Sequence, residues 1–238
     1  TRGEGAGAGF CFNINKENSV ESLFEVQYAS DGGYDFWSNE NQASWTSTFM
    51  GPRGANFVGG GWGWNQPTQE FVNSYEAGDK RKEKTIFYEG CPNYDGKEYK
   101  ANYSLTGYNV KKFLVPLSAF PSYDNSPLNF PIMRYSEVLL MKAEALLRMN
   151  QAALALPLVN EVRTQRNATA LATVTVDDLL DELGREFFWE SHRRSDLIRS
   201  GKYLDAWQEK PASDRRALLF PIPLDQLGNN KLTQSPGY

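Results

Sequence analysis

The clearest hydrophobic pattern in the chain lies between Arg134 and Arg148, where apolar residues recur at helical spacing. The face that they form consists of Tyr135, Val138, Leu139, Ala143, Leu146 and Leu147. Leu140 and Met141 widen this face, which predicts a core helix buried on more than one side. Pro131 is suited to the position just before such a helix, because amide groups at a helix start have no hydrogen-bond partner within the helix.

A second helix is predicted over Gln151–Gln165, with its start near residues 154–156, because Pro157 is best tolerated in a first turn. Its apolar face consists of Leu154, Leu158, Val159 and Val162. Two consecutive helices joined by a short turn are typical of a tetratricopeptide-type hairpin. The chain contains no visible second copy of that repeat, so periodicity alone leaves the repeat assignment open.

A third and longer helix is predicted from Thr175, which forms a capping box with Asp178, to about Arg199. Its apolar face consists of Leu179, Leu180, Leu183, Phe187, Phe188 and Leu197. Glycine in a helix interior costs about 1 kcal/mol relative to alanine, so Gly184 indicates a close contact at that point. Glu182, Glu186 and Glu190 are spaced four residues apart and resemble an acid–base pair, but arginines at helical spacing favour a structural charge ladder. Glu182 with Arg185 and Glu190 with Arg194 are the expected ion pairs of this ladder.

The first half of the chain shows weaker periodicity. Residues 18–29 alternate in part and predict a short strand, and residues 67–78 predict a helix that starts at Pro67-Thr68 and stops at Gly78. The charged run 79–84 is interpreted as a surface turn. Residues 90–130 predict short strands or extended loops, since they are rich in Gly, Pro, Asn and Tyr.

The irregular stretch from Ser30 to Asn65 contains four of the six tryptophans, together with Tyr34, Phe36, Phe49 and Phe57. Disordered segments are poor in aromatic residues, so this stretch is not a flexible linker. Aromatic rings among Asn and Gln side chains are typical of a sugar-binding surface, because a pyranose ring has an apolar face and hydroxyl groups. Any single Trp is expected to fill the core, whereas at least one of the group is expected to line a site. Within the stretch, residues 59–63 predict a turn that presents Trp62 and Trp64.

Composition excludes several function classes. The formal net charge is −4 and no basic stripe is present, which argues against a nucleic-acid partner. No apolar run is long enough to cross a bilayer. His192 is the single histidine and stands without a cysteine nearby, which argues against a metal site. Cys11 and Cys91 allow either one disulfide or two separate thiols. No set of residues in the sequence predicts catalysis.

Several further stretches, taken together and in order, are more specific than any single motif. They are Asn18–Ser22, Phe24–Val26, Pro67–Phe71, Asp79–Arg81, Arg134–Ala145, Asn160–Arg163, Glu182, Gly184–Phe187, Glu190, His192–Arg193, Asp196–Arg199, Gly201, Phe220–Pro223, Leu232–Gln234 and Pro236–Tyr238. This ensemble resembles the SusD/RagB family, the surface glycan-binding lipoproteins of Bacteroidetes nutrient-uptake systems. The chain departs from the usual pattern at Leu183, Ser191, Lys231 and Ser235, where Arg, Gly, Pro and Asn are common.

The resemblance implies a mainly α fold: a SusD-like, tetratricopeptide-type helical scaffold that carries a long, loop-rich ligand-binding region with few short strands. Residues 1–130 are expected to form the aromatic ligand-binding region, and residues 131–238 the helical scaffold and tail. The chain would be the C-terminal portion of such a protein, with the signal and the lipid anchor before Thr1.

The resemblance further implies non-catalytic binding of a glycan at the cell surface and delivery to a SusC-like TonB-dependent outer-membrane transporter, without a cofactor. Family members present aromatic arcs from a loop region like residues 34–65. The ligand-binding residues expected on that basis are Trp37, Trp45, Trp62, Trp64 and Tyr34, with polar help from Asp31, Asn39, Asn41 and Asn65.

Three alternatives remain open from the sequence. One is RagB-like capture of peptides or glycopeptides, which an anionic loop region would suit. Another is a glycan-cleaving enzyme that uses a pair among Asp31, Asp35 and Glu40. In the third, a structural lid, all of the aromatic rings are buried.

Overall fold

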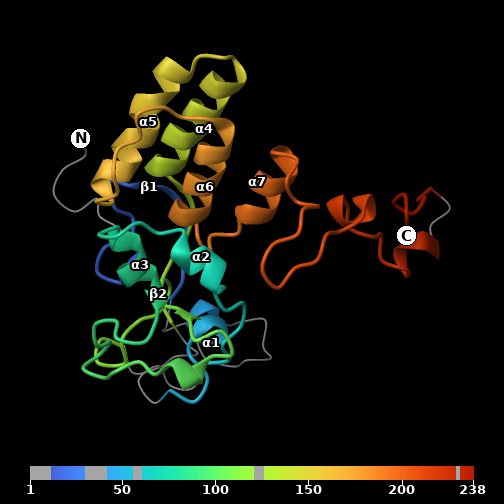
Figure 1. Ribbon diagram of the computed structural model, residues 1–238. Coiled ribbons are helices and arrows are strands. Elements are labelled where there is room, and N and C mark those ends of the chain that lie inside the picture. The colour runs from blue at the N-terminus through green and yellow to red at the C-terminus, as the bar shows by residue number, and fades with distance from the viewer. Residues whose placement is uncertain (1–11, 30–41, 56–60, 121–125, 229–230) are drawn as a thin grey trace.

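The computed structural model describes residues 12–29, 42–55, 61–120, 126–228 and 231–238 (Figure 1). In these ranges the α-helices are α1 (Thr46–Met50), α2 (Gln69–Asn73), α3 (Lys80–Thr85), α4 (Tyr135–Arg148), α5 (Ala152–Gln165), α6 (Val176–Glu186) and α7 (Arg193–Arg199). Short 3₁₀ helices are η2 (Ala101–Tyr103), η3 (Arg215–Leu218) and η4 (Gln226–Gly228). The strands are β1 (Ser22–Val26), β2 (Ile86–Phe87), β3 (Asn109–Val110) and β4 (Phe130–Arg134). The predicted fold class, mainly helical with few short strands, is confirmed.

Helices α4, α5 and α6 lie side by side and enclose the main hydrophobic core (Figure 1). The buried residues of this core are Leu139, Leu140, Ala143, Leu147, Ala155, Val159, Val162, Val174, Leu179, Leu183 and Phe187. The predicted core helix is therefore confirmed as α4. Leu140 is buried as predicted, but Val138 of the predicted face and Met141 of its widened part are 37% and 44% exposed.

The strand predicted within residues 18–29 is confirmed as β1, which pairs antiparallel with β4. Pro131 belongs to β4 and does not lead directly into the helix as expected. A two-stranded sheet consists of edge strands only, where a missing amide hydrogen is tolerated. Helix α4 instead begins four residues later, and the Tyr135 amide donates to the carbonyl of Glu21 at 2.8 Å.

The boundaries of the next two predicted helices need correction. Helix α5 begins at Ala152, earlier than residues 154–156, and continues through Pro157. Leu154, expected on its buried face, is 59% exposed. The capping box of Thr175 and Asp178 is confirmed at the start of α6.

The helix predicted to run from Thr175 to Arg199 is wrong as one element, because α6 ends at Glu186 and α7 starts at Arg193. In the turn between them, Trp189 and Ser191 adopt φ angles of 64° and 69°. The close contact expected at Gly184 is confirmed: a Cβ there would lie 2.9 Å from the Arg193 guanidinium, which the turn folds back against α6.

The helix expected over residues 67–78 is shorter, since α2 ends at Asn73. Thr68 caps it by accepting a hydrogen bond from the amide of Phe71 at 3.2 Å. The surface turn expected at residues 79–84 is wrong. Asp79 caps α3 and Arg81 is only 2% exposed, because acidic side chains of α6 surround its guanidinium.

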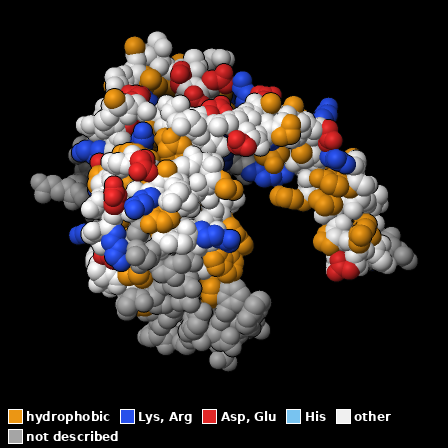
Figure 2. All heavy atoms as spheres, turned by 60° about the horizontal axis from the view of Figure 1, so that its bottom comes forward, with side chains coloured by type: hydrophobic (Ala, Val, Ile, Leu, Met, Phe, Trp, Pro, Cys, Tyr) orange, Lys and Arg blue, Asp and Glu red, His pale blue; other side chains and the backbone are white. Residues whose placement is uncertain are grey.

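The C-terminal arm, residues 203–228 and 231–238, stands apart from the helical body, with open space between them (Figure 2). Its base is tied to α2 by two reciprocal hydrogen bonds between Glu70 and Gln208, at 2.7 and 2.8 Å. Apolar side chains are exposed on the arm, among them Leu219, Phe220 and Leu224. The expected division of the chain near residue 130 stays a prediction. In the described part of the chain, no helix combines the length and apolarity needed to cross a membrane.

Candidate functional site

Four aromatic rings gather around the short helix α1, at the end of the molecule opposite α4 and α5 (Figure 1). They belong to Trp45, Phe49, Trp62 and Trp64, and we call them the aromatic platform. Phe49 is at the centre: its ring stacks on Trp64 at 4.9 Å with an interplanar angle of 2°, and Trp62 lies 5.3 Å away. Trp45 precedes it by one helical turn, at 6.4 Å.

The backbone of residues 61–64 runs along the end of α1 and fixes the two C-terminal rings of the platform. The amides of Trp62 and Trp64 donate to the carbonyls of Thr48 and Phe49 at 2.7 and 2.8 Å. Between them, the amide of Gly63 donates to the carbonyl of Gly51. A Cβ at Gly61 would overlap the Gly51 backbone, so only glycine permits this close approach. The glycine-rich sequence thus brings a second segment against α1.

The platform is open to solvent on one side. Trp64 is 49% exposed, although its other face is stacked on Phe49. Trp45, Phe49 and Trp62 are half-buried. The structural-lid alternative, in which every aromatic ring is buried, is therefore wrong for the described tryptophans. A flat ring supported from below and exposed above is the geometry that stacking on an apolar ligand face requires.

Among the predicted binding residues, Trp45, Trp62 and Trp64 are brought together in the platform. Asn65 follows directly, with an exposed side chain and a φ angle of 49°. The remaining predicted residues lie outside the described residues: Asp31, Tyr34, Trp37, Asn39 and Asn41. So do the three acidic residues considered for an enzyme, Asp31, Asp35 and Glu40.

Sequence reasoning missed two contributors to this region. Phe49 follows Trp45 by four residues, a helical spacing that was a usable signal for a ring on the same face. Trp189 donates its indole hydrogen to the carbonyl of Asn65 at 3.1 Å. The two residues are 124 positions apart, and no local pattern indicates such a contact.

Polar groups border the platform. The side-chain amide of Gln66 donates to the carbonyl of Gly63 at 3.1 Å and accepts from the amide of Leu105 at 3.0 Å. Gln66 therefore links the platform segment to the loop around Leu105, whose side chain is 99% exposed.

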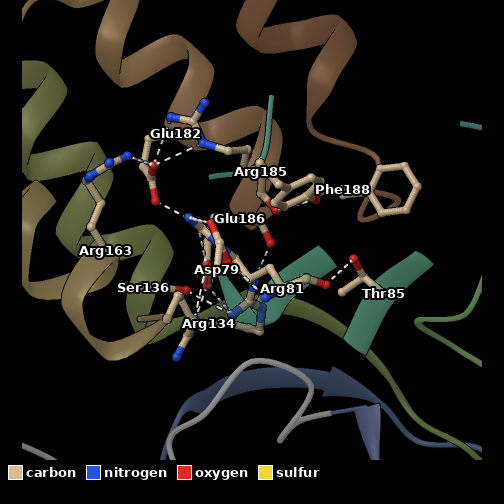
Figure 3. A network of polar contacts seen from close by, with 12 residues as sticks. Asp79, Arg81, Thr85, Arg134, Ser136, Arg163, Glu182, Arg185, Glu186 and Phe188 are labelled. Carbon is tan, nitrogen blue, oxygen red and sulfur yellow. Dashed lines mark hydrogen bonds and ion pairs between the residues drawn. The ribbon is translucent and has the colours of Figure 1, made fainter. Parts of the chain in front are cut away.

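The charge ladder predicted on α6 is confirmed as a buried ion network (Figure 3). Glu186 contacts the guanidinium groups of Arg166, Arg134 and Arg81 at 2.8, 3.1 and 3.2 Å. Burial alone would raise the pKa of Glu186, but Arg166 and Arg134 hold this pKa well below its usual range. A carboxylate held ionised by three cations is a structural group and a poor proton donor.

Of the two ion pairs expected in the ladder, one is confirmed and one is wrong. Glu182 does pair with Arg185, at 3.0 Å, and also binds Arg81 and Arg163. Glu190 pairs with Arg134 and Lys112 and not with Arg194. Arg194 donates instead to the carbonyl of Ala217 at 3.0 Å and so holds the C-terminal arm.

Other candidate chemistry is sparse in the described ranges. His192 Nδ1 lies 3.5 Å from Glu137 Oε1 of α4. Among the described residues, no group of three His, Cys, Asp or Glu side chains is placed to hold a metal ion. Cys91 is a buried free thiol, and Cys11 lies outside the described residues, so their pairing is untested.

Comparison with known proteins agrees with this architecture. The laminarin-binding SusD-like protein superposes with a TM-score of 0.80 and 26% sequence identity, over 97% of this chain and 52% of that chain. The surface glycan-binding protein A from Bacteroides fluxus gives a TM-score of 0.79 at 25% identity, over 97% and 53%. The starch-binding protein SusD from Bacteroides thetaiotaomicron is 36% identical over 121 residues, which make up 46% of this chain and 22% of that protein.

The similarity identifies a family, and it covers only part of each relative's length. The chain spans about half the length of the solved relatives it matches, 52% and 53%. The sequence pattern that defines the SusD family matches residues 20–213, which include α1 and all of α4 to α7. The chain belongs to the SusD family.

Proposed function

We propose that this chain is part of a non-catalytic protein that binds an oligosaccharide or polysaccharide through the aromatic platform. The observation that carries the proposal is the Trp64 ring, which is stacked on Phe49 and remains 49% exposed. A pyranose ring has one face of C–H groups that can stack on such a surface. Its hydroxyl groups need hydrogen-bonding partners, which amides such as those of Asn65 and Gln66 supply.

Binding through stacked rings is weak at each contact. An aromatic contact contributes about 0.5–1.5 kcal/mol beyond the area that it buries. Several rings in one platform are therefore needed for useful affinity, and a chain of sugars is a better ligand than a single sugar. The names of two similar proteins, one laminarin-binding and one starch-binding, support a glucan as the ligand class.

The wider role that we propose follows from family membership. The complete protein would stand on the outer-membrane surface, held by a lipid anchor outside residues 1–238. It would pass its glycan to a SusC-like TonB-dependent transporter. The membrane contact of this chain would then be indirect.

Affinity electrophoresis in native gels that contain laminarin or starch tests the binding proposal. The unmodified chain is expected to be retarded by one of the two glucans, and Trp64→Ala is expected to lose most of this retardation. Trp207→Ala is the matched control, because Trp207 is a 36% exposed tryptophan on the C-terminal arm. Equal retardation of all three proteins would contradict a site at the platform.

Two further outcomes separate this proposal from its alternatives. Binding of basic peptides, with no retardation by any glycan, would favour the peptide-capture function. Release of shorter sugars from a bound glycan would contradict the non-catalytic role, since a binding protein returns its ligand unchanged. Chromatography of the glycan after incubation with the chain measures this directly.

A further inference from the structure

The turn between α6 and α7 reaches the residue next to the aromatic platform through Trp189. The indole nitrogen of Trp189 donates to the carbonyl of Asn65 at 3.1 Å, immediately after Trp64 in the chain. Trp189 also packs against the buried cluster that contains Met50, the last residue of α1. One side chain therefore bonds to the residue that follows Trp64 and packs against the cluster to which α1 contributes Met50.

This turn has an unusual backbone that is held in place by a buried lysine. Trp189 has a φ angle of 64°, a left-handed conformation that is costly for a residue with a side chain. The ammonium group of Lys112 donates to the carbonyls of Glu186 and Phe188, both at 3.1 Å, and to the carboxylate of Glu190. Lys112 is 4% exposed, so one buried ammonium group binds three hydrogen-bond acceptors in the residues around Trp189.

The same lysine lies next to the anchor of α1. The residue after it, Phe113, is fully buried, and its carbonyl accepts a hydrogen bond from the Ser47 hydroxyl of α1 at 2.8 Å. Lys112 and Phe113 thus support both segments of the platform. Phe113 binds α1 through Ser47, and Lys112 supports segment 61–65 through the turn that carries Trp189. Phe49 and Trp64 close this ring of contacts where they stack.

We propose that Trp189 is a positioning residue for the platform: its indole hydrogen bond sets where segment 61–65 lies against α1, and hence how Trp64 stacks on Phe49. Trp189 acts through Asn65 and is not itself a contact for the ligand. The expected effect on glycan affinity rests on the proposed function. The expected effect on the order of the platform does not.

Trp189→Phe tests this proposal, because it keeps an aromatic ring in the cluster and removes the indole donor. A hydrogen bond of ordinary net strength corresponds to a change of roughly 3- to 10-fold in an equilibrium constant. We expect amide hydrogen exchange at Gly63 and Trp64 to accelerate by about this factor, and glucan affinity to fall by a similar one. Exchange in α4 and the melting temperature are expected to change little. Trp207→Phe is the matched control.

The outcomes separate the two proposals. Unchanged exchange at Gly63 and Trp64 in Trp189→Phe would overturn the positioning role, whatever the affinity. If the unmodified chain binds no glycan, the proposed function fails, and the exchange measurement still decides the role of Trp189. If Trp189→Phe does not fold, the exchange rate of the Trp189 indole hydrogen is measured in the unmodified chain instead. Exchange as fast as that of the Trp207 indole would then overturn the proposal.

Discussion

At the scale of single residues, Glu186 shows how this protein holds charges inside its core. The carboxylate is buried and meets the guanidinium groups of Arg81, Arg134 and Arg166, which come from three different segments. Figure 3 labels the first two of them beside Glu186. Removing a carboxylate from water is costly, and only close opposite charges offset that cost. Glu186 therefore joins α3, the end of β4 and the residue that follows α5.

The first prediction concerns Glu186→Gln. The neutral amide leaves three buried cations with less compensating charge, which we expect to lower the free energy of unfolding by about 3–5 kcal/mol. Urea unfolding followed by circular dichroism measures this change. Glu83→Gln is the control, because the Glu83 side chain is 47% exposed and 3.8 Å from Lys84. A change below about 1 kcal/mol in Glu186→Gln would contradict the assigned role.

The second prediction concerns acid stability. The folded pKa of Glu186 lies below its ordinary 4.5: burial would raise it, and Arg166 and Arg134 outweigh burial. The pKa of Glu190 is lowered in the same way by Arg134 and Lys112. A carboxyl group with a depressed folded pKa stabilises the fold fully above its unfolded pKa, and this contribution is lost as the pH falls through the folded pKa. We expect the free energy of unfolding to fall below about pH 4.5.

Urea unfolding at a series of pH values from neutral to about pH 3 tests this dependence. Glu186→Gln lacks one of the groups responsible, so its stability should fall less steeply over the acid range. An equally steep fall in the variant and in the unmodified chain would show that other carboxyl groups control acid unfolding.

At the scale of elements, the start of α6 is fixed by local chemistry alone. The Thr175 hydroxyl accepts from the amide of Asp178 at 3.1 Å, and the Asp178 carboxylate accepts from the amide of Thr175 at 2.8 Å. Thr175→Ala is expected to lower the free energy of unfolding by about 1 kcal/mol, because a helix amide loses its partner. Thr173→Ala, at an exposed position two residues earlier, is the control. Equal stability of the two variants would refute the capping contribution.

The contact between segment 61–64 and α1 is a second element-scale feature open to test. Gly61→Ala places a methyl group where the Gly51 backbone lies, so the segment must move away from α1. We expect glucan affinity to drop at least about 10-fold, which corresponds to roughly 1.4 kcal/mol of binding free energy. The helical circular dichroism of the α4–α6 core is expected to stay unchanged. Gly228→Ala is the control for the loss of a glycine without such a contact, since nothing lies within 4 Å of a Cβ there. Undiminished affinity in Gly61→Ala would contradict the need for this contact.

Elements set by neighbouring residues were predictable from the sequence, and elements set by distant partners were not. The period of α4 and the capping box of α6 are local patterns, so both were predicted correctly. The buried position of Arg81 depends on Glu182, 101 residues away, and the charged run around it therefore suggested a surface turn. The break between α6 and α7 depends on Lys112, whose partners in the turn are 74 to 78 residues distant.

At the scale of the whole molecule, family membership was predictable because it rests on many scaffold residues in a fixed order. The candidate site was predictable only in part. Trp45, Trp62 and Trp64 were expected from the family resemblance and their place in the aromatic stretch, and they do meet at α1, but no periodicity pointed to Trp189. Loop regions lack the repeating pattern from which side-chain directions are inferred. The scaffold thus identifies the family, and the proposed binding surface lies in the loops.

The central claim is that the aromatic platform binds a glycan, and the indole resonances of the tryptophans test it most directly. Nuclear magnetic resonance of the ¹⁵N-labelled chain, titrated with the glucan that retards it in native gels, follows each indole N–H separately. We predict that the resonances of Trp62 and Trp64 shift as the glucan saturates the site, while that of Trp207 on the C-terminal arm does not move. A shift at Trp207 with none at Trp62 or Trp64 would contradict the account.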